Sequence, residues 1–139
     1  MCKHIRVIYW AKNIQILLAV FILCACSTID HNKAITNVNV LEQGKSSRDS
    51  AKFTDICKGF MLTDKQIIAF YTVAAEIPVE TSSEKFGILP CYTSGTAYLY
   101  GTKYNWQIRS GGFGEFYTAN HTILKLCGKA CCKKVEGIC

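Results

Sequence analysis

Six cysteines in the later part of the chain constrain what this sequence can fold into more than any other feature. Nine cysteines occur in the 139 residues, and six of them lie beyond residue 50: Cys57, Cys91, Cys127, Cys131, Cys132 and Cys139. An even set in an oxidising compartment predicts a disulfide framework, with fifteen pairings open. Such bonds suit a small domain, because a short chain buries too little apolar surface to be stabilised by its core alone.

The densest cysteine group, from 127 to 139, raises the alternative of a zinc site. Four thiolates can bind zinc, but the spacing C-x3-C-C-x6-C matches no common two-plus-two pattern. Neighbouring Cys131 and Cys132 would strain a bond to each other, so we expect them to reach different partners. A bond between Cys57 and Cys91 would close a loop of about 35 residues, worth roughly 3–4 kcal/mol. Disulfides are therefore favoured, and no metal or other cofactor is expected.

The first 25 residues have the order of a secretory signal. Basic residues at positions 3, 6 and 12 precede an apolar run over 16–23, and small residues follow. A retained membrane helix is the alternative. It would need roughly 20 apolar residues, and Asn13 and Gln15 interrupt the run upstream.

The four residues Leu23-Cys24-Ala25-Cys26 resemble a lipobox, the processing site of bacterial lipoprotein precursors. The resemblance implies that Cys26 receives a diacylglyceryl thioether, that type II signal peptidase cuts before it, and that its new amine is acylated, as with palmitate. Ser27 follows where an aspartate would signal inner-membrane retention. The resemblance therefore implies a lipid anchor in the outer membrane of a Gram-negative cell envelope, facing the periplasm.

This processing also accounts for the cysteine number and the charge. Once Cys2 and Cys24 leave with the signal and Cys26 carries lipid, the six later cysteines remain. Removal of three basic residues lowers the formal net charge from +6 to +3, which is too mild to argue for a nucleic-acid partner.

The segment over 26–52 is expected to be the lipidated cysteine and a flexible tether. It is polar, its apolar residues are scattered, and it ends in a Ser46-Ser47-Arg48-Asp49-Ser50 cluster. Such a coil spans roughly 25–30 Å between its ends. The alternative is a strand from Thr36 to Leu41 that docks on the domain. The folded domain is expected over 53–139.

One helix is predicted after residue 63. Thr63-Asp64-Lys65-Gln66 has the layout of a capping box. An apolar stripe at helical spacing follows, and Pro78 is expected to end the helix. The stripe consists of Ile67, Phe70, Tyr71 and Ala74, widened by Ile68 and Ala75.

The periodicity changes to that of strands after residue 91. Three apolar residues alternate with three polar ones, Tyr104, Trp106 and Ile108 with Asn105, Gln107 and Arg109. Further strands are predicted over 97–100, 113–118 and 122–127, with links short enough for hairpins. We therefore expect a single α+β domain, with one helix packed on an antiparallel sheet of about four strands, braced by disulfides.

No catalytic motif is present, and no catalytic residue is assigned. The predicted domain contains a single histidine, His121, in a predicted turn, and nucleophilic catalysis would need it beside a nucleophile. Cys91 is the best thiol for that role, but a disulfide would silence it. Arg109 and Glu115 fit a solvated cross-strand pair better than a catalytic one. The glycines over 111–114 fit a hairpin turn or a bulge, since no helix follows to bind an anion.

Aromatic residues beyond 91 indicate a binding surface instead. One helix can cover only one face of the sheet, so the other face is predicted to present Asn105, Gln107 and Arg109, with Tyr98 or Tyr100 from a neighbouring strand. Four lysines near the C-terminus (Lys125, Lys129, Lys133 and Lys134) form a basic end that could meet an acidic partner or anionic lipid, although a solvated surface is favoured.

The sequence thus predicts a non-catalytic binding lipoprotein held at the membrane by Cys26. Its partner would be an envelope or periplasmic protein, and one subclass is an inhibitor or immunity-type protein. The alternative is a structural adaptor for peptidoglycan or an outer-membrane complex, and a hydrolase is the least favoured reading. Beyond the targeting segment, the domain resembles small cysteine-containing bacterial lipoproteins of unknown role.

Overall fold

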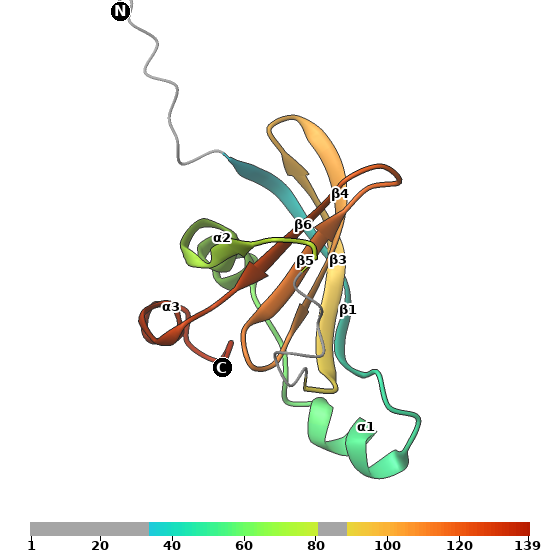
Figure 1. The fold of residues 1–139 in the computed structure, drawn as a ribbon. Coiled ribbons are helices and arrows are strands. Elements are labelled where there is room, and N and C mark those ends of the chain that lie inside the picture. The colour runs from blue at the N-terminus through green and yellow to red at the C-terminus, as the bar shows by residue number, and fades with distance from the viewer. Residues whose placement is uncertain (1–33, 81–88) are drawn as a thin grey trace, which may run out of the picture.

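The computed structural model describes residues 34–80 and 89–139, so the predicted signal peptide and Cys26 lie outside the described residues. A six-stranded antiparallel sheet in the order β1-β3-β4-β5-β6-β2 is accompanied by three helices (Figure 1). The strands are β1 (Ile35–Ser46), β2 (Ala75–Ile77), β3 (Cys91–Leu99), β4 (Thr102–Arg109), β5 (Phe113–Tyr117) and β6 (Thr122–Leu126). The helices are α1 (Ala51–Cys57), α2 (Asp64–Val73) and α3 (Lys129–Lys134).

The predicted α+β class, the antiparallel sheet and its disulfide bracing are confirmed, but one helix and about four strands were too few. The four expected strands form the central meander from β3 to β6, with β3 starting earlier than expected, at Cys91. β1 and β2 add one strand at each edge. The short helices α1 and α3 were not predicted.

Helix α2 follows the sequence prediction at its start. The Thr63 hydroxyl accepts from the Gln66 amide, and the Gln66 side chain accepts from the Thr63 amide, so the capping box is complete. Ile67, Phe70, Tyr71 and Ala74 are all buried.

The predicted end of this helix at Pro78 is wrong. Helix α2 stops at Val73, and Ala74 is already extended. Ala75, expected to widen the helical stripe, is exposed and begins strand β2. Residues 75–77 instead pair with β6 as strand β2, although their sequence also fits a helix. The sequence pattern alone does not show that a partner strand is available there.

The tether prediction is wrong for residues 35–46, which form β1, the longest strand of the sheet. The docked strand considered over 36–41 is present and longer, so the described fold begins before Phe53. Register shifts interrupt the pairing of β1 with β3 at three places. Asn37 and Gly44 lie in these irregular regions and have positive φ angles of 48° and 59°. Such bulges hide the alternating pattern of a strand.

Residues of β1 and β3 form hydrogen bonds with the chain that joins α1 to α2. The Gln43 amide donates to the Leu62 carbonyl (2.9 Å) and its oxygen accepts from the Leu62 amide (2.9 Å). The Gly44 amide and the buried Thr93 hydroxyl both donate to the Phe60 carbonyl, at 3.0 and 3.1 Å. The linker between α1 and α2 is therefore hydrogen-bonded to β1 at Phe60 and Leu62.

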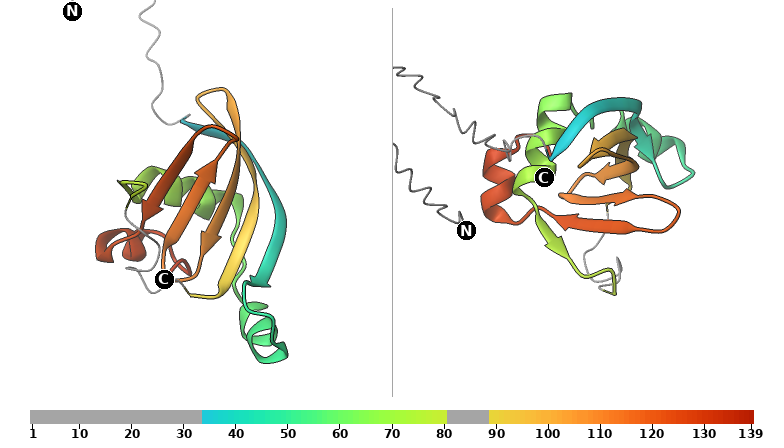
Figure 2. Two further views of the ribbon diagram at one scale, coloured as in Figure 1. Left: turned by 45° about the vertical axis from the view of Figure 1, so that its right-hand side comes forward. Right: turned by 90° about the horizontal axis from the view of Figure 1, so that it is seen from above.

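The core lies between α2 and the side of the sheet that faces it (Figures 1 and 2). Two glycines make this close packing possible. A Cβ at Gly114 would lie 2.5 Å from the Phe70 ring, and a Cβ at Gly95 would lie 2.6 Å from the Trp106 indole and 2.0 Å from the Asn39 carbonyl oxygen. Gly114 is therefore a packing position for α2, whereas Gly111 and Gly112 adopt the positive φ angles of a turn.

We predict that Gly114→Ala lowers the free energy of unfolding by about 1–3 kcal/mol, because Phe70 is fully buried and has no room to retreat. The matched control is Gly59→Ala, whose added methyl would meet nothing within 4 Å and should change stability by less than about 0.5 kcal/mol. Urea unfolding of both variants measures the difference. Equal stability of the two would contradict the assigned packing of Phe70.

Candidate functional site

Alternate side chains of β3 and β4 form the face of the sheet that points away from α2. We call this surface the open face. Its members pair across the two strands: Tyr92 with Arg109, Ser94 with Gln107, Thr96 with Asn105, and Tyr98 with Lys103. All eight are exposed or half-buried, whereas Trp106 and Ile108, on the other side of β4, are almost fully buried. The predicted division of β4 into a core side and an outer side is confirmed.

The neighbouring strands define the extent of the open face. On β5, Tyr117 pairs with Asn105 and is 40% exposed, so it adds a second exposed tyrosine beside Tyr98. On the β1 side, the Ser94 hydroxyl donates to the Glu42 carboxylate (2.9 Å). Phe113 and Leu124 lie on the same side of β5 and β6 but are buried, so they do not belong to this surface.

Arg109 is held in place within the open face. Its guanidinium donates to the Gln107 side-chain oxygen (2.8 Å) and lies 5.7 Å from the centre of the Tyr92 ring. The cross-strand pair considered for Arg109 and Glu115 forms no ion pair among the described residues, where Lys58–Asp55 is the ion pair found. Glu115 instead lies opposite Gln107. The guanidinium is therefore oriented by neutral partners, and its charge is available to another molecule.

Tyr98 lies where the sequence placed it, but Tyr100 does not. Tyr98 is 38% exposed on the open face. Tyr100 is in the two-residue turn between β3 and β4, where it and Gly101 have positive φ angles of 49° and 85°, the signature of a type I′ hairpin. The residue lines a pocket with Tyr71 and Lys125 on the helix side. The turn changes the direction of its side chain, so strand alternation does not extend to it.

The basic end is also divided by the fold. Lys129, Lys133 and Lys134 are exposed on α3, but Lys125 is on β6 and only 9% exposed. It donates to the Ala74 carbonyl (3.2 Å). Lys125 therefore does not contribute to a surface patch at the C-terminus.

The catalytic candidates raised by the sequence do not come together. Cys91 is bonded to Cys57 and so has no free thiol. His121 shares a hydrogen bond with the Tyr104 hydroxyl (3.0 Å), and the two rings meet edge to face. Cys91 lies beside Ser110, after the end of β4, and His121 lies near the start of β4, so the Cys–His pair that nucleophilic catalysis requires is not assembled from them.

All six later cysteines are paired, as Cys57–Cys91, Cys127–Cys131 and Cys132–Cys139. The expectation that Cys131 and Cys132 reach different partners is confirmed. The first bond joins the end of α1 to the start of β3, and the other two fasten α3 and the C-terminus to the end of β6. Only the first of these pairs was singled out from the sequence.

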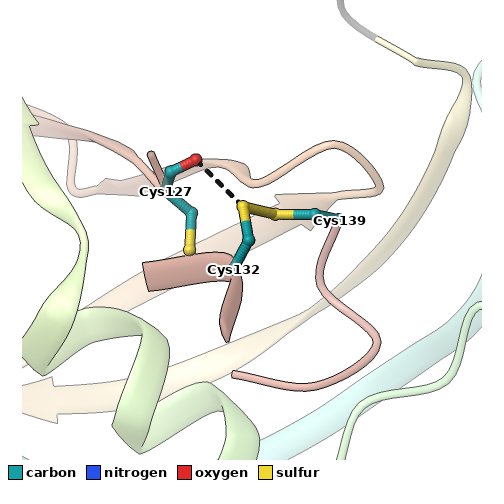
Figure 3. Close-up of side chains that lie close together, drawn as sticks. All are labelled: Cys127, Cys132 and Cys139. Carbon is teal, nitrogen blue, oxygen red and sulfur yellow. Dashed lines mark hydrogen bonds between the residues drawn. A yellow bond between two sulfur atoms is a disulfide. The ribbon is translucent and has the colours of Figure 1, made fainter. Parts of the chain in front are cut away.

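The sulfurs of Cys127, Cys132 and Cys139 lie within 4.8 Å of one another (Figure 3). Three sulfurs at such distances suit a metal only as thiolates, and all three belong to disulfides here. The contact drawn in Figure 3 joins Cys132 Sγ to the Cys127 carbonyl oxygen at 3.5 Å. An oxidised sulfur carries no proton to donate, so this contact is packing and not a hydrogen bond.

Among residues 34–80 and 89–139, no helix is long and apolar enough to cross a membrane. Comparison of the chain with family models, with curated proteins and with solved structures finds no match.

We predict that the protein, purified without reductant, takes up no alkylating reagent at these six cysteines until it is reduced. Peptide mapping by mass spectrometry without reductant should recover the three pairs given above. Stoichiometric zinc together with free thiols at 127, 132 and 139 would contradict this pairing.

Proposed function

We propose that this chain is a lipid-anchored, periplasm-facing binding protein that holds a protein partner on its open face and performs no catalysis. The observation that carries the proposal is the exposed and half-buried surface that β3 and β4 turn away from α2. Its exposed tyrosines and hydrogen-bonding side chains are the kinds of group that protein interfaces use. An inhibitor or immunity-type role is one form that such binding takes.

The chemistry of the open face favours a partner with a mixed polar surface. The described charges alternate across the strands, with Lys103 and Arg109 on β4, Glu115 on β5 and Glu42 on β1. Such a balance gives little long-range attraction to a strongly charged polymer. It suits a partner whose own charges and hydrogen-bonding groups match position by position.

The lipid anchor rests on the Leu23-Cys24-Ala25-Cys26 segment, and we predict that Cys26→Ala abolishes lipid labelling. The variant should accumulate as the unprocessed precursor, because type II signal peptidase acts on the lipidated cysteine. Growth with a radiolabelled fatty acid, followed by electrophoresis, measures both effects. Cys24→Ala is the control and should keep the label. Label that survives in Cys26→Ala would rule out the anchor.

We predict that Arg109→Glu weakens capture of the partner from solubilised envelopes by at least about tenfold, the usual range for losing a charged contact. The change should shift stability by roughly 0.5 kcal/mol at most. Lys129→Glu is the matched control, because it makes the same charge reversal at the exposed first position of α3, where an acidic residue is tolerated. Quantitative mass spectrometry of the captured proteins compares the two variants with the parent.

Three outcomes of this capture are informative. One protein lost with Arg109→Glu and kept with Lys129→Glu supports the proposal. Equal loss with both variants would indicate a nonspecific charge effect and contradict the open face as the site. Capture of peptidoglycan or of many envelope components, unaffected by Arg109→Glu, would favour a structural adaptor instead.

A further inference from the structure

A pocket of about 430 Å³ lies on the helix side of the sheet, away from the open face. It is an open hollow, lined by the C-terminal part of α2, by strands β2 and β6, and by the hairpin between β3 and β4. Its lining includes Ala34, Tyr71, Glu76, Tyr100, Ile123 and Lys125. The volume is within the range of small-molecule sites, which combine apolar walls with a few converging polar groups.

Lys125 is the most unusual of these polar groups. Only 9% of the residue is exposed, and its ammonium lies 4.7 Å from the centre of the Tyr71 ring. One of its three N–H groups donates to the Ala74 carbonyl at the end of α2 (3.2 Å), where a cation is favoured by the helix dipole. Stabilisation of the helix end therefore accounts for one donor, and the other two have no acceptor among the described residues.

Glu76 is the register partner of Lys125, yet the two do not form an ion pair among the described residues. Burial lowers the pKa of Lys125, and the attraction of Glu76 opposes that change. A mostly buried lysine with two unused donors favours an acceptor that can reach its ammonium. The pocket is where such an acceptor has room to approach.

Tyr71 supplies a second donor at the same place. Its ring packs edge-on against Phe116 with 4.9 Å between centroids, and the residue is 6% exposed. Burial, together with Tyr100, Glu76 and Tyr104 nearby, raises the pKa of its hydroxyl to about 12. The hydroxyl therefore keeps its proton at neutral pH and can donate it to a ligand.

Tyr100 is the most exposed aromatic residue that lines the pocket. It adopts a left-handed φ of 49° and is 76% exposed, at a turn position that glycine, asparagine or aspartate normally occupies. Its amide donates to the Ala34 carbonyl (3.1 Å), which fixes the turn against the start of β1. A large ring held out in an unfavourable conformation indicates a role beyond the fold.

We propose that this pocket binds a small ligand with one carboxylate and a flat apolar group. The carboxylate accepts hydrogen bonds from Lys125 Nζ and the Tyr71 hydroxyl, and the flat group lies against the Tyr100 ring. A second negative charge on the ligand is disfavoured, because the Glu76 carboxylate also lines the pocket. This site is independent of the partner proposed for the open face.

The test is a ¹⁵N–¹H NMR titration of the full chain, in nonionic detergent, with phenylacetate and with its neutral match phenylacetamide. Phenylacetate should give saturable shifts at the amides of Tyr100, Ile123 and Lys125. Phenylacetamide should bind at least about tenfold more weakly, because it lacks the charged acceptor. No shift of these amides with phenylacetate, or equal binding of the two compounds, would overturn the proposal.

Four variants separate ligand recognition from the stability of the fold. Tyr100→Asn places an Asn-Gly pair in the turn, so it should raise the melting temperature while weakening phenylacetate binding several-fold, by about threefold or more. Lys125→Met should weaken binding by at least about tenfold, whereas Lys103→Met, an equal loss of charge on the open face, should leave it unchanged. If Tyr100→Asn or Lys125→Met folds and binds like the parent, the assigned contacts are wrong. Arg109→Glu should not affect this titration, so failure here and failure of the open face are distinguishable.

Discussion

The close approach of α2 to the middle of the sheet determines most of the remaining structure. Phe70 occupies the space that any side chain at position 114 would fill. With Phe70 seated there, its neighbour Tyr71 packs edge-on against Phe116. The Lys125 ammonium then lies over the Tyr71 ring and bonds the carbonyl at the end of the helix. The lack of a side chain at Gly114 on β5 thus lets α2 approach the sheet closely, and α2 in turn positions the polar groups around its C-terminal end.

This packing also explains why the two sides of the sheet differ in chemistry. On β3 and β4, the residues that face α2 are buried or half-buried apart from Thr102 at the hairpin end, and most are apolar, whereas their neighbours in sequence face outwards and are polar or tyrosine. A sheet covered by a helix on one side leaves the other side free to vary without loss of the core. The open face can therefore carry recognition while Trp106 and Ile108, one residue away, carry stability.

Much of this architecture could be predicted from the sequence, and the failures have physical causes. The capping box at Thr63 and the alternation around Trp106 are local signals, and the helix begins and the strand forms where expected. β1 was missed because its bulges at Asn37 and Gly44 break the period of two that identifies a strand. β2 was missed because its three residues continue a helical pattern and become a strand only by pairing with β6.

The candidate site was predictable in part for the same reason. Asn105, Gln107 and Arg109 follow from strand alternation, and Tyr98 follows from the register of a hairpin. The position of the Tyr100 side chain could not be predicted in this way, because a positive φ angle in the turn redirects it. The Lys125 pocket gave no sequence signal at all, since it combines residues of α2, β2, β6 and a hairpin that meet only in three dimensions.

The course of β1 has a mechanical consequence. β1 is an edge strand whose first residue pairs with Leu99 and whose last pairs with Cys91. Tension applied to the chain ahead of Ile35 therefore acts first on the bonds between β1 and β3 and would peel them in order towards Ser46. At that end the peeling would meet Cys91, which is covalently joined to α1 through Cys57. Once β1 has peeled, the disulfide gives the load a covalent route from α1 to β3 that bypasses the backbone of α2.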